Sequence, residues 1–250
     1  LLLAVELTVF RFQTHAAVPP LVRRLLIGLL VIPTTAIVGY LIYQTFDAAN
    51  LYQLRSFNLG ERLLTEARVM FLYLQWILLP DIRSMGLFHD DIQKSTSLFN
   101  PLTTSFALVG ILALVVMALA GIRRARLQPL SFAILWFLGG HLLESTTIPL
   151  ELAFEHRNYI PAYGPLFALG YYLTHNPLWA TRLRPAFKAV LVIALLALPA
   201  NELHQRAKHW STFEDFVLHE AKNHPRSARV MFHLGYSLYE VGAYQEALEY

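Results

Sequence analysis

Several apolar runs in this chain are long enough to cross a lipid bilayer, and they limit its possible folds more than any other feature. About 20 apolar residues span the roughly 30 Å hydrocarbon core, and helices satisfy their own backbone there. Composition agrees, because 56% of the 250 residues are hydrophobic and only 15% are charged. The sequence predicts an all-α, polytopic membrane domain over residues 1–203. Its expected spans lie at about residues 1–10, which is only partial, 25–43, 104–122, 131–150, 161–175 and 187–203.

Arginine and lysine are concentrated in three short segments between these spans. The residues concerned are Arg11, Arg23 and Arg24, then Arg123, Arg124 and Arg126, then Arg182, Arg184 and Lys188. Positively charged loops stay in the cytoplasm, so loops 44–103 and 144–160 and the C-terminal region are predicted outside. The net charge of +3 resides mostly in these loops, which argues against nucleic-acid binding. Cysteine is absent, so thiolate metal sites and disulfides are excluded.

A twelve-residue apolar run at 69–80 is too short to cross a bilayer. The residues before it include Glu61, Arg62, Glu66 and Arg68, and helical spacing places Arg62 and Glu66 on one side. We expect an amphipathic helix over about 61–79 that lies in the membrane interface.

Beyond residue 203 the chain becomes polar, with apolar residues at helical spacing. Residues 228–250 match the start of a tetratricopeptide repeat, with Leu234 and Gly235 adjacent, Gly242 at the turn and Ala247 where two helices touch. We therefore expect residues 204–250 to begin an extracytoplasmic α-solenoid of such repeats. The sequence begins with Leu1 and stops inside this repeat, so we expect it to be a piece of a longer protein.

Acids, a histidine and an arginine lie between two apolar stretches in residues 144–158. Ionisable residues at membrane depth are costly and usually functional; the alternative is a solvated loop. These residues are Glu144, Glu151, Glu155, His156 and Arg157. His89, Asp90 and Asp91 offer metal-ligand chemistry, but three adjacent side chains point in different directions, so no metal site is assigned.

Two segments resemble blocks of the transmembrane and tetratricopeptide-repeat O-mannosyltransferases, most closely bacterial-type members. The resemblance covers roughly residues 60–250, including the order of a membrane region followed by repeats. The matching residues are Arg68, Tyr73, Pro80 and Asp90 in the first block, and Pro149, Glu155, Arg157, Tyr159, Pro161 and Gly164 in the second.

The resemblance implies the C-terminal half of a GT-C glycosyltransferase. Such an enzyme transfers a sugar, expected to be mannose, from a polyprenyl-phosphate carrier to protein Ser or Thr outside the cytoplasm. Its catalytic acid lies in a first outer loop that this chain lacks, so no base is assigned. Arg157 and Arg68 are expected to hold the carrier phosphate. The remaining expected substrate-site residues are Glu144, Glu151 and Glu155, which would orient the arginines, together with Tyr159, His156 and Asp90.

The expected partners are the bilayer, the polyprenyl-phosphate lipid and proteins bound by the repeats, with the bacterial inner membrane as location and the repeats in the periplasm. No cofactor beyond the donor lipid is assigned, and the need for a divalent metal stays open. Two alternatives remain: a membrane-anchored repeat scaffold for envelope or pilus assembly, and a ligase or polymerase acting on polyprenyl-linked glycans. A scaffold needs no charges within the membrane, so the 144–158 segment discriminates between these functions.

Overall fold

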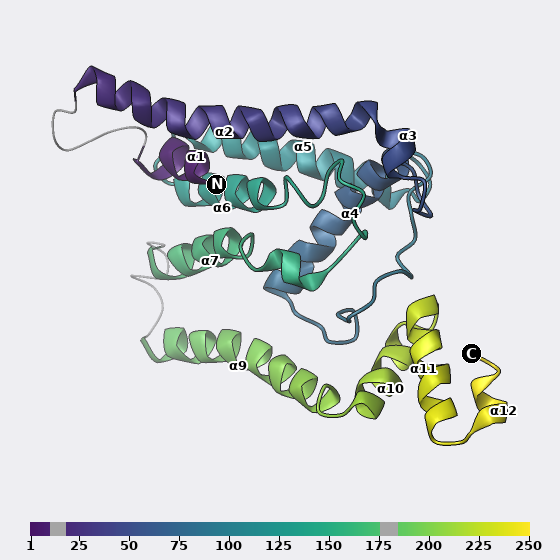
Figure 1. Cartoon of the computed structure of the whole chain (residues 1–250). Helices are drawn as coiled ribbons and strands as arrows, with labels where there is room; N and C mark the ends of the chain where they lie inside the picture. Colours follow the sequence, from purple (N-terminus) through teal and green to yellow (C-terminus); the bar gives the residue numbers. More distant parts are fainter. Residues whose placement is uncertain (11–18, 176–184) are drawn as a thin grey trace. The chain divides into compact units, whose positions relative to one another are not determined.

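The computed structural model describes residues 1–10, 19–175 and 185–250, and the described chain is all-helical, as predicted (Figure 1). Its only pairing of strand type is an isolated bridge between Ser97 and Asn100. The elements are α1 (Leu2–Val5), the π-helical η1 (Glu6–Phe10), α2 (Pro20–Phe46), α3 (Ala48–Leu51), α4 (Leu59–Leu78), α5 (Thr103–Gly121), α6 (Gln128–Gly140), the 3-10 helix η2 (Glu155–Asn158), α7 (Tyr163–His175), α9 (Pro185–His209), α10 (Phe213–Asn223), α11 (Ala228–Glu240) and α12 (Tyr244–Ala247).

The chain divides into two compact units. The first unit comprises Leu1–Leu74, Lys94–Leu150 and Arg157–Thr174. The second unit comprises Gln75–Gln93, Glu151–His156 and His175–Tyr250. Each unit is therefore built from segments that are distant in the sequence.

Three of the described helices, α2, α5 and α9, are long and apolar enough to span a membrane. They coincide with the spans expected at 25–43, 104–122 and 187–203, and little of their surface is buried within the protein. Helices whose apolar side chains stay exposed require a hydrocarbon environment. The expectation of a membrane protein is thus supported by length and composition. Of the arginines that orient the expected spans, Arg11, Arg182 and Arg184 lie outside the described residues.

The spans expected at 131–150 and 161–175 appear as the 13-residue helices α6 and α7, each shorter than a full crossing. Helix α6 ends at Gly140, where a Cβ would lie 2.8 Å from the Cγ of Pro161. This close approach favours glycine, which is also a poor helix former. The following residues, through Phe154, form turns and irregular backbone. The partial span expected at 1–10 is a short α-helix followed by the π-helical turn.

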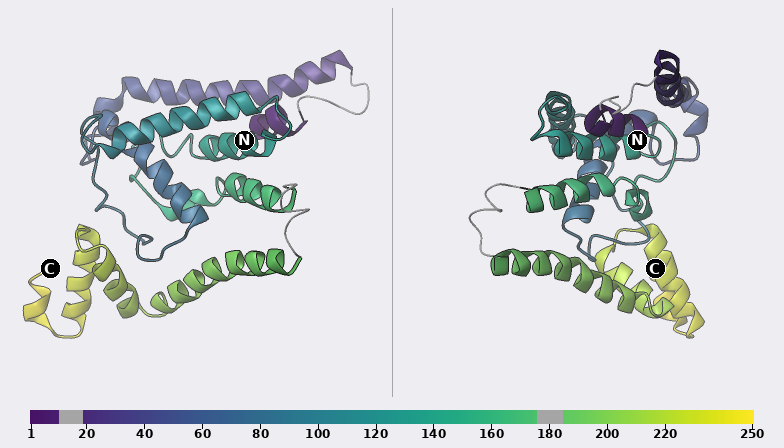
Figure 2. Two further views of the ribbon diagram at one scale, coloured as in Figure 1. Left: turned by 180° about the vertical axis from the view of Figure 1, so that it is seen from behind. Right: turned by 90° about the vertical axis from the view of Figure 1, so that its left-hand side faces the viewer.

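In the first unit α5 and α6 lie side by side, as Figures 1 and 2 show. Helix α7 packs on α6 at Gly164, where a Cβ would lie 2.6 Å from the carbonyl oxygen of Ala133. The indole of Trp136 on α6 donates a hydrogen bond to the carbonyl of Ile160, just before α7 (2.7 Å). These contacts position the segment that contains Arg157.

In the second unit α9 leads into α10, α11 and α12. The α10 and α11 N-termini are capped by Thr212 and Ser227, whose hydroxyls accept hydrogen bonds from the third residue along. Gly242 has a φ of 81°, a conformation that favours glycine, and α12 then returns against α11. Two helices are present within the segment 228–250, and Leu248, after the second, is 81% exposed.

Candidate functional site

The charged side of α4 faces the protein interior. Arg62 and Thr65 are completely buried and Glu66 is 2% exposed, whereas Leu63 is 40% exposed. The helix expected at 61–79 is present, but its charged side, which an interfacial helix turns to water, is buried. A buried charge requires partners, and these lie in the turns that follow α6.

The guanidinium group of Arg62 makes most of the contacts with these turns. It donates to three backbone carbonyls. Nε donates to the carbonyl of Thr146 (2.9 Å), Nη1 to the carbonyl of Leu150 (2.5 Å) and Nη2 to the carbonyl of Glu144 (2.6 Å). Nη2 also lies 2.9 Å from Oε1 of Glu66. Backbone that is not helical needs such donors where water is scarce. Arg62 therefore holds the turn region against α4.

Burial strongly perturbs the carboxyl group of Glu66. Burial raises the pKa of its carboxyl group to about 7, and the charges of Arg62 and Arg157 and the hydroxyl of Ser145 offset only part of that effect. The carboxyl group consequently changes charge near neutral pH.

Arg157 lies in η2. Burial lowers the pKa of the Arg62 guanidinium, and the charge of the nearby Arg157 lowers it further. The Nε of Arg157 is 3.5 Å from Oε2 of Glu144. The side chain of Arg157 is 4% exposed and that of Glu144 is 44% exposed. We call Arg62, Glu66, Glu144 and Arg157 the arginine cluster. It combines two buried cations with one carboxylate that opens to solvent, an arrangement suited to exchanging that carboxylate for an anionic ligand.

Arg68 and Tyr159, the other two predicted site residues in the first unit, are not members of the arginine cluster. Arg68 donates to the hydroxyl of Ser95 (3.4 Å), which in turn bonds to Thr104 (2.8 Å). Six residues along a helix turn the side chain by about 240° from that of Arg62, which explains the different partners. Tyr159 is 80% exposed.

The remaining four predicted residues belong to the second unit. Asp90 accepts a hydrogen bond from Ser227 (2.5 Å), Glu151 pairs with Arg229 (2.8 Å) and Glu155 pairs with Arg206. His156 is exposed and stacks on Phe154. Glu151 and Glu155, which were expected to orient Arg157 and Arg68, thus pair with arginines of α11 and α9, and Asp90 contacts the N-cap of α11.

The trio His89, Asp90 and Asp91 has divergent partners, as adjacent side chains should. The ring of His89 packs on Trp76, Asp90 accepts from Ser227, and Asp91 pairs with His224. Within the described ranges, no group of three or more His, Asp or Glu side chains is arranged to hold a metal ion.

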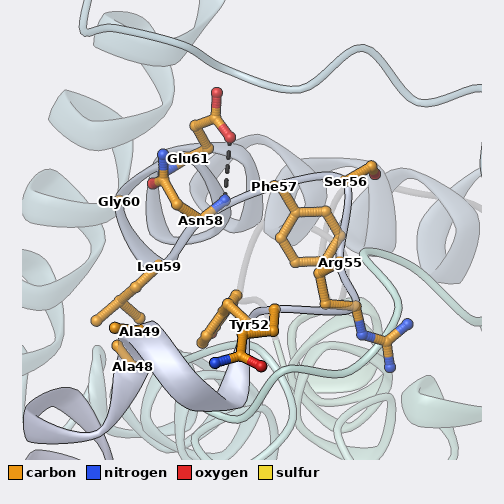
Figure 3. A pocket seen from close by; sticks show the side chains of 11 residues that line it. Ala48, Ala49, Tyr52, Arg55, Ser56, Phe57, Asn58, Leu59, Gly60 and Glu61 are labelled. Atoms are coloured by element: carbon orange, nitrogen blue, oxygen red, sulfur yellow. Dashed lines mark hydrogen bonds between the residues drawn. The ribbon is translucent and has the colours of Figure 1, made fainter.

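A surface pocket of about 500 Å³ lies where α3 leads into α4 (Figure 3). At its rim Asn58 and Glu61 form reciprocal hydrogen bonds, in which Asn58 N donates to Glu61 Oε2 (3.0 Å) and Glu61 N donates to Asn58 Oδ1 (2.9 Å). The eight predicted site residues lie elsewhere. The residues that line this pocket are Ala48, Ala49, Tyr52, Gln53, Arg55, Ser56, Phe57, Asn58, Leu59, Gly60 and Glu61.

No family model matches the chain, and no curated protein or solved structure matches it either.

Proposed function

We propose that this chain forms the carrier-binding part of a GT-C membrane glycosyltransferase. In this proposal the enzyme transfers a sugar from a polyprenyl-phosphate carrier to protein Ser or Thr outside the cytoplasm, and the sugar is mannose. The supporting observation is the arginine cluster, in which Arg157 is buried beside Arg62 and paired with the half-exposed Glu144. Two cations in a unit with apolar helices suit a phosphate whose lipid tail lies in the bilayer.

The chemistry of the transfer explains the need for a fixed guanidinium. The acceptor hydroxyl attacks the anomeric carbon and loses its proton, while the bond from that carbon to the carrier phosphate breaks. Negative charge then grows on the departing phosphate, and a preorganised cation stabilises it more in the transition state than in the ground state. Arg157 fits this role when the phosphate replaces Glu144, because guanidinium binds phosphate through two parallel hydrogen bonds.

The repeats have their own place in this proposal. Helices α10, α11 and α12 would begin a tetratricopeptide-repeat solenoid on the extracytoplasmic side, where it binds acceptor proteins. Support comes from the tight glycine turn at Gly242 and from the contact between Gly235 and Ala247, where a Cβ on Gly235 would lie 3.2 Å from the Ala247 carbonyl. Small residues at this crossing are a feature of the repeat.

The proposal is tested by sugar transfer from a polyprenyl-phosphate donor in membranes that contain the protein. Arg157→Lys keeps the charge but loses the planar fork, so transfer should fall at least about tenfold, equivalent to about 1.4 kcal/mol. Arg83→Lys is the control, because Arg83 is exposed and pairs with Asp81, two residues before it. Binding of the sugar-free polyprenyl phosphate should weaken in parallel. Full transfer by both Arg157→Lys and Arg157→Ala would refute the carrier site.

A repeat scaffold is the second candidate, and one observation favours it. Asp90, Glu151 and Glu155 are engaged with α9 and α11, so these acids already have a structural role. A scaffold would depend on those contacts and be indifferent to Arg157. Partner assembly that survives Arg157→Ala but fails when Asp90 is replaced by Ala would support it.

A further inference from the structure

Loop segments of the second unit hold α9, α10 and α11 through a set of buried and half-buried polar contacts. We call this set the clasp. It is independent of the arginine cluster and of the proposed glycosyl transfer. The clasp residues are Gly86, Leu87, His89, Asp90, Asp91 and Glu155 on the loop side, and Arg206, Glu220, His224 and Ser227 on the helix side.

One part of the clasp surrounds Glu220 on α10, which is 1% exposed. Its Oε2 accepts a hydrogen bond from the backbone N–H of Leu87 (2.9 Å). A Cβ on Gly86 would lie 2.6 Å from the same oxygen. The loop backbone therefore fits directly against the helix, with no space for a side chain between them.

A second part secures the start of α11. The hydroxyl of Ser227 caps this helix by accepting from the N–H of Val230 (3.1 Å), and it donates its own proton to Oδ1 of Asp90 (2.5 Å). Oδ2 of Asp90 lies 3.4 Å from the N–H of Arg229. A carboxylate at a helix N-terminus is favourable, so Asp90 stabilises α11 as well as binding it.

The third part is a pair between Asp91 and His224, which follows the last residue of α10. Oδ2 of Asp91 is 3.0 Å from Nδ1 of His224, and the two side chains are only 15% and 8% exposed. The ring of His89 lies edge-on to His224 at a centroid distance of 5.6 Å. Glu220 and Glu155 act on His224 from α10 and from the second loop segment, and Arg206 on α9 neutralises Glu155.

We propose that the Asp91–His224 pair makes the clasp pH-dependent, so that it is tight while His224 is protonated and loosens as this histidine loses its proton. His224 is the only member of the pair that titrates near neutral pH, and its neutral form retains only a weaker hydrogen bond to the Asp91 carboxylate, without the ion pair.

The direction of the effect follows from the pKa shifts. The hydrogen bond from His224 to Asp91 raises the pKa of His224 above its usual 6.5, and burial opposes this only partly. The stabilisation is therefore fully present below about 6.5 and is lost as pH rises through the raised value. For Asp91 and Glu155, burial raises the pKa but the facing cations lower it more. The contributions of these two carboxylates to stability are therefore lost only in acid, as pH falls through their lowered pKa values.

Hydrogen exchange of the whole protein in lipid nanodiscs tests this proposal. Protection of the Leu87 and Val230 amides, corrected for intrinsic exchange, should fall between about pH 5.5 and 8.5, because the charged bond from His224 to Asp91 is lost as pH rises through the raised pKa of His224. His224→Gln keeps a hydrogen-bond donor without titrating, so its protection should show no such pH dependence. His204→Gln, at an exposed position on α9, is the matched control and should behave as the wild type.

Two results would overturn the proposal: protection in the wild type that does not change over this range, or a His224→Gln profile that retains the slope. If His224→Gln also loses protection within α10, Asp91→Asn decides the matter. The amide keeps the acceptor oxygen but removes the charge, so the midpoint should move to lower pH. An unchanged midpoint in Asp91→Asn contradicts the assigned pair.

Discussion

At the residue scale, Arg62 illustrates how one side chain can satisfy backbone that no helix satisfies. Its three carbonyl partners lie 82 to 88 residues further along the chain. It also forms an ion pair with Glu66 that is screened from water. Removal of the guanidinium would leave three carbonyls without this donor and the Glu66 carboxylate without this ion pair, and such losses are costly in a buried site.

We predict that Arg62→Ala lowers the free energy of unfolding by about 3–5 kcal/mol, the cost of breaking a buried ion pair. Thermal unfolding of the protein in detergent measures the effect. Arg83→Ala removes an exposed arginine and should leave the midpoint unchanged. Equal midpoints for the two variants would show that Arg62 is not structurally important.

Glu66 gives a prediction about pH. Its pKa is about 7 in the folded protein, against 4.5 for an unperturbed glutamate, so the folded state binds the extra proton between these values. Its contribution to stability is present below pH 4.5 and is lost as pH rises to about 7, by roughly 3 kcal/mol at most. Glu66→Gln cannot titrate. The difference between the two unfolding profiles should therefore follow this slope, and parallel profiles would contradict it.

At the element scale, the packing of α7 on α6 depends on one of the two glycines within α7. Gly164 is buried against the backbone of Ala133, whereas no atom lies within 4 Å of the Cβ position of Gly170. We predict that Gly164→Ala destabilises the protein by about 1–3 kcal/mol through overpacking. Gly170→Ala should instead be neutral or stabilise by about 0.5–1 kcal/mol, since alanine is the better helix former. Thermal unfolding of both variants checks the contrast, which would be absent if α6 and α7 did not touch.

The sequence was sufficient to predict the elements whose information is local. Helices α2, α5 and α9 follow from apolar runs, and the turn at Gly242 follows from repeat spacing. The early end of α6 could not be predicted, because it depends on how closely Pro161 approaches Gly140.

The site was less accessible to sequence reasoning than the helices. Arg62 was recognised only as a charge on an amphipathic helix, because its backbone partners are distant in sequence. An Arg and a Glu four residues apart in a largely apolar helix were the available signal. The pairing of Arg157 with Glu144 fits the expected grouping. The contacts of Asp90 and Glu155 with distant helices could not be inferred from spacing alone.

At the scale of the whole molecule, the distribution of arginine predicts which parts face outwards. These 250 residues contain no cysteine, so a single cysteine introduced among them is the only one in this part of the protein. Cysteine at Ser56 or Ser211, both exposed, should react with an impermeant thiol reagent in intact cells. Cysteine at Ala125, exposed between α5 and α6, should react only after the membrane is permeabilised. Labelling of position 125 in intact cells would reverse the topology.

The distance in sequence between Arg62 and its carbonyl partners also delays the formation of these contacts during biosynthesis. At about 5–20 residues per second, the ribosome needs roughly 4–18 seconds after adding Arg62 to deliver the turns that complete its guanidinium contacts. Throughout that interval the charged side of α4 lacks its carbonyl partners and must remain in contact with water, lipid headgroups or an insertion factor. Final packing of α4 must therefore wait for the turns after α6, which makes assembly of the first unit a late event in biosynthesis.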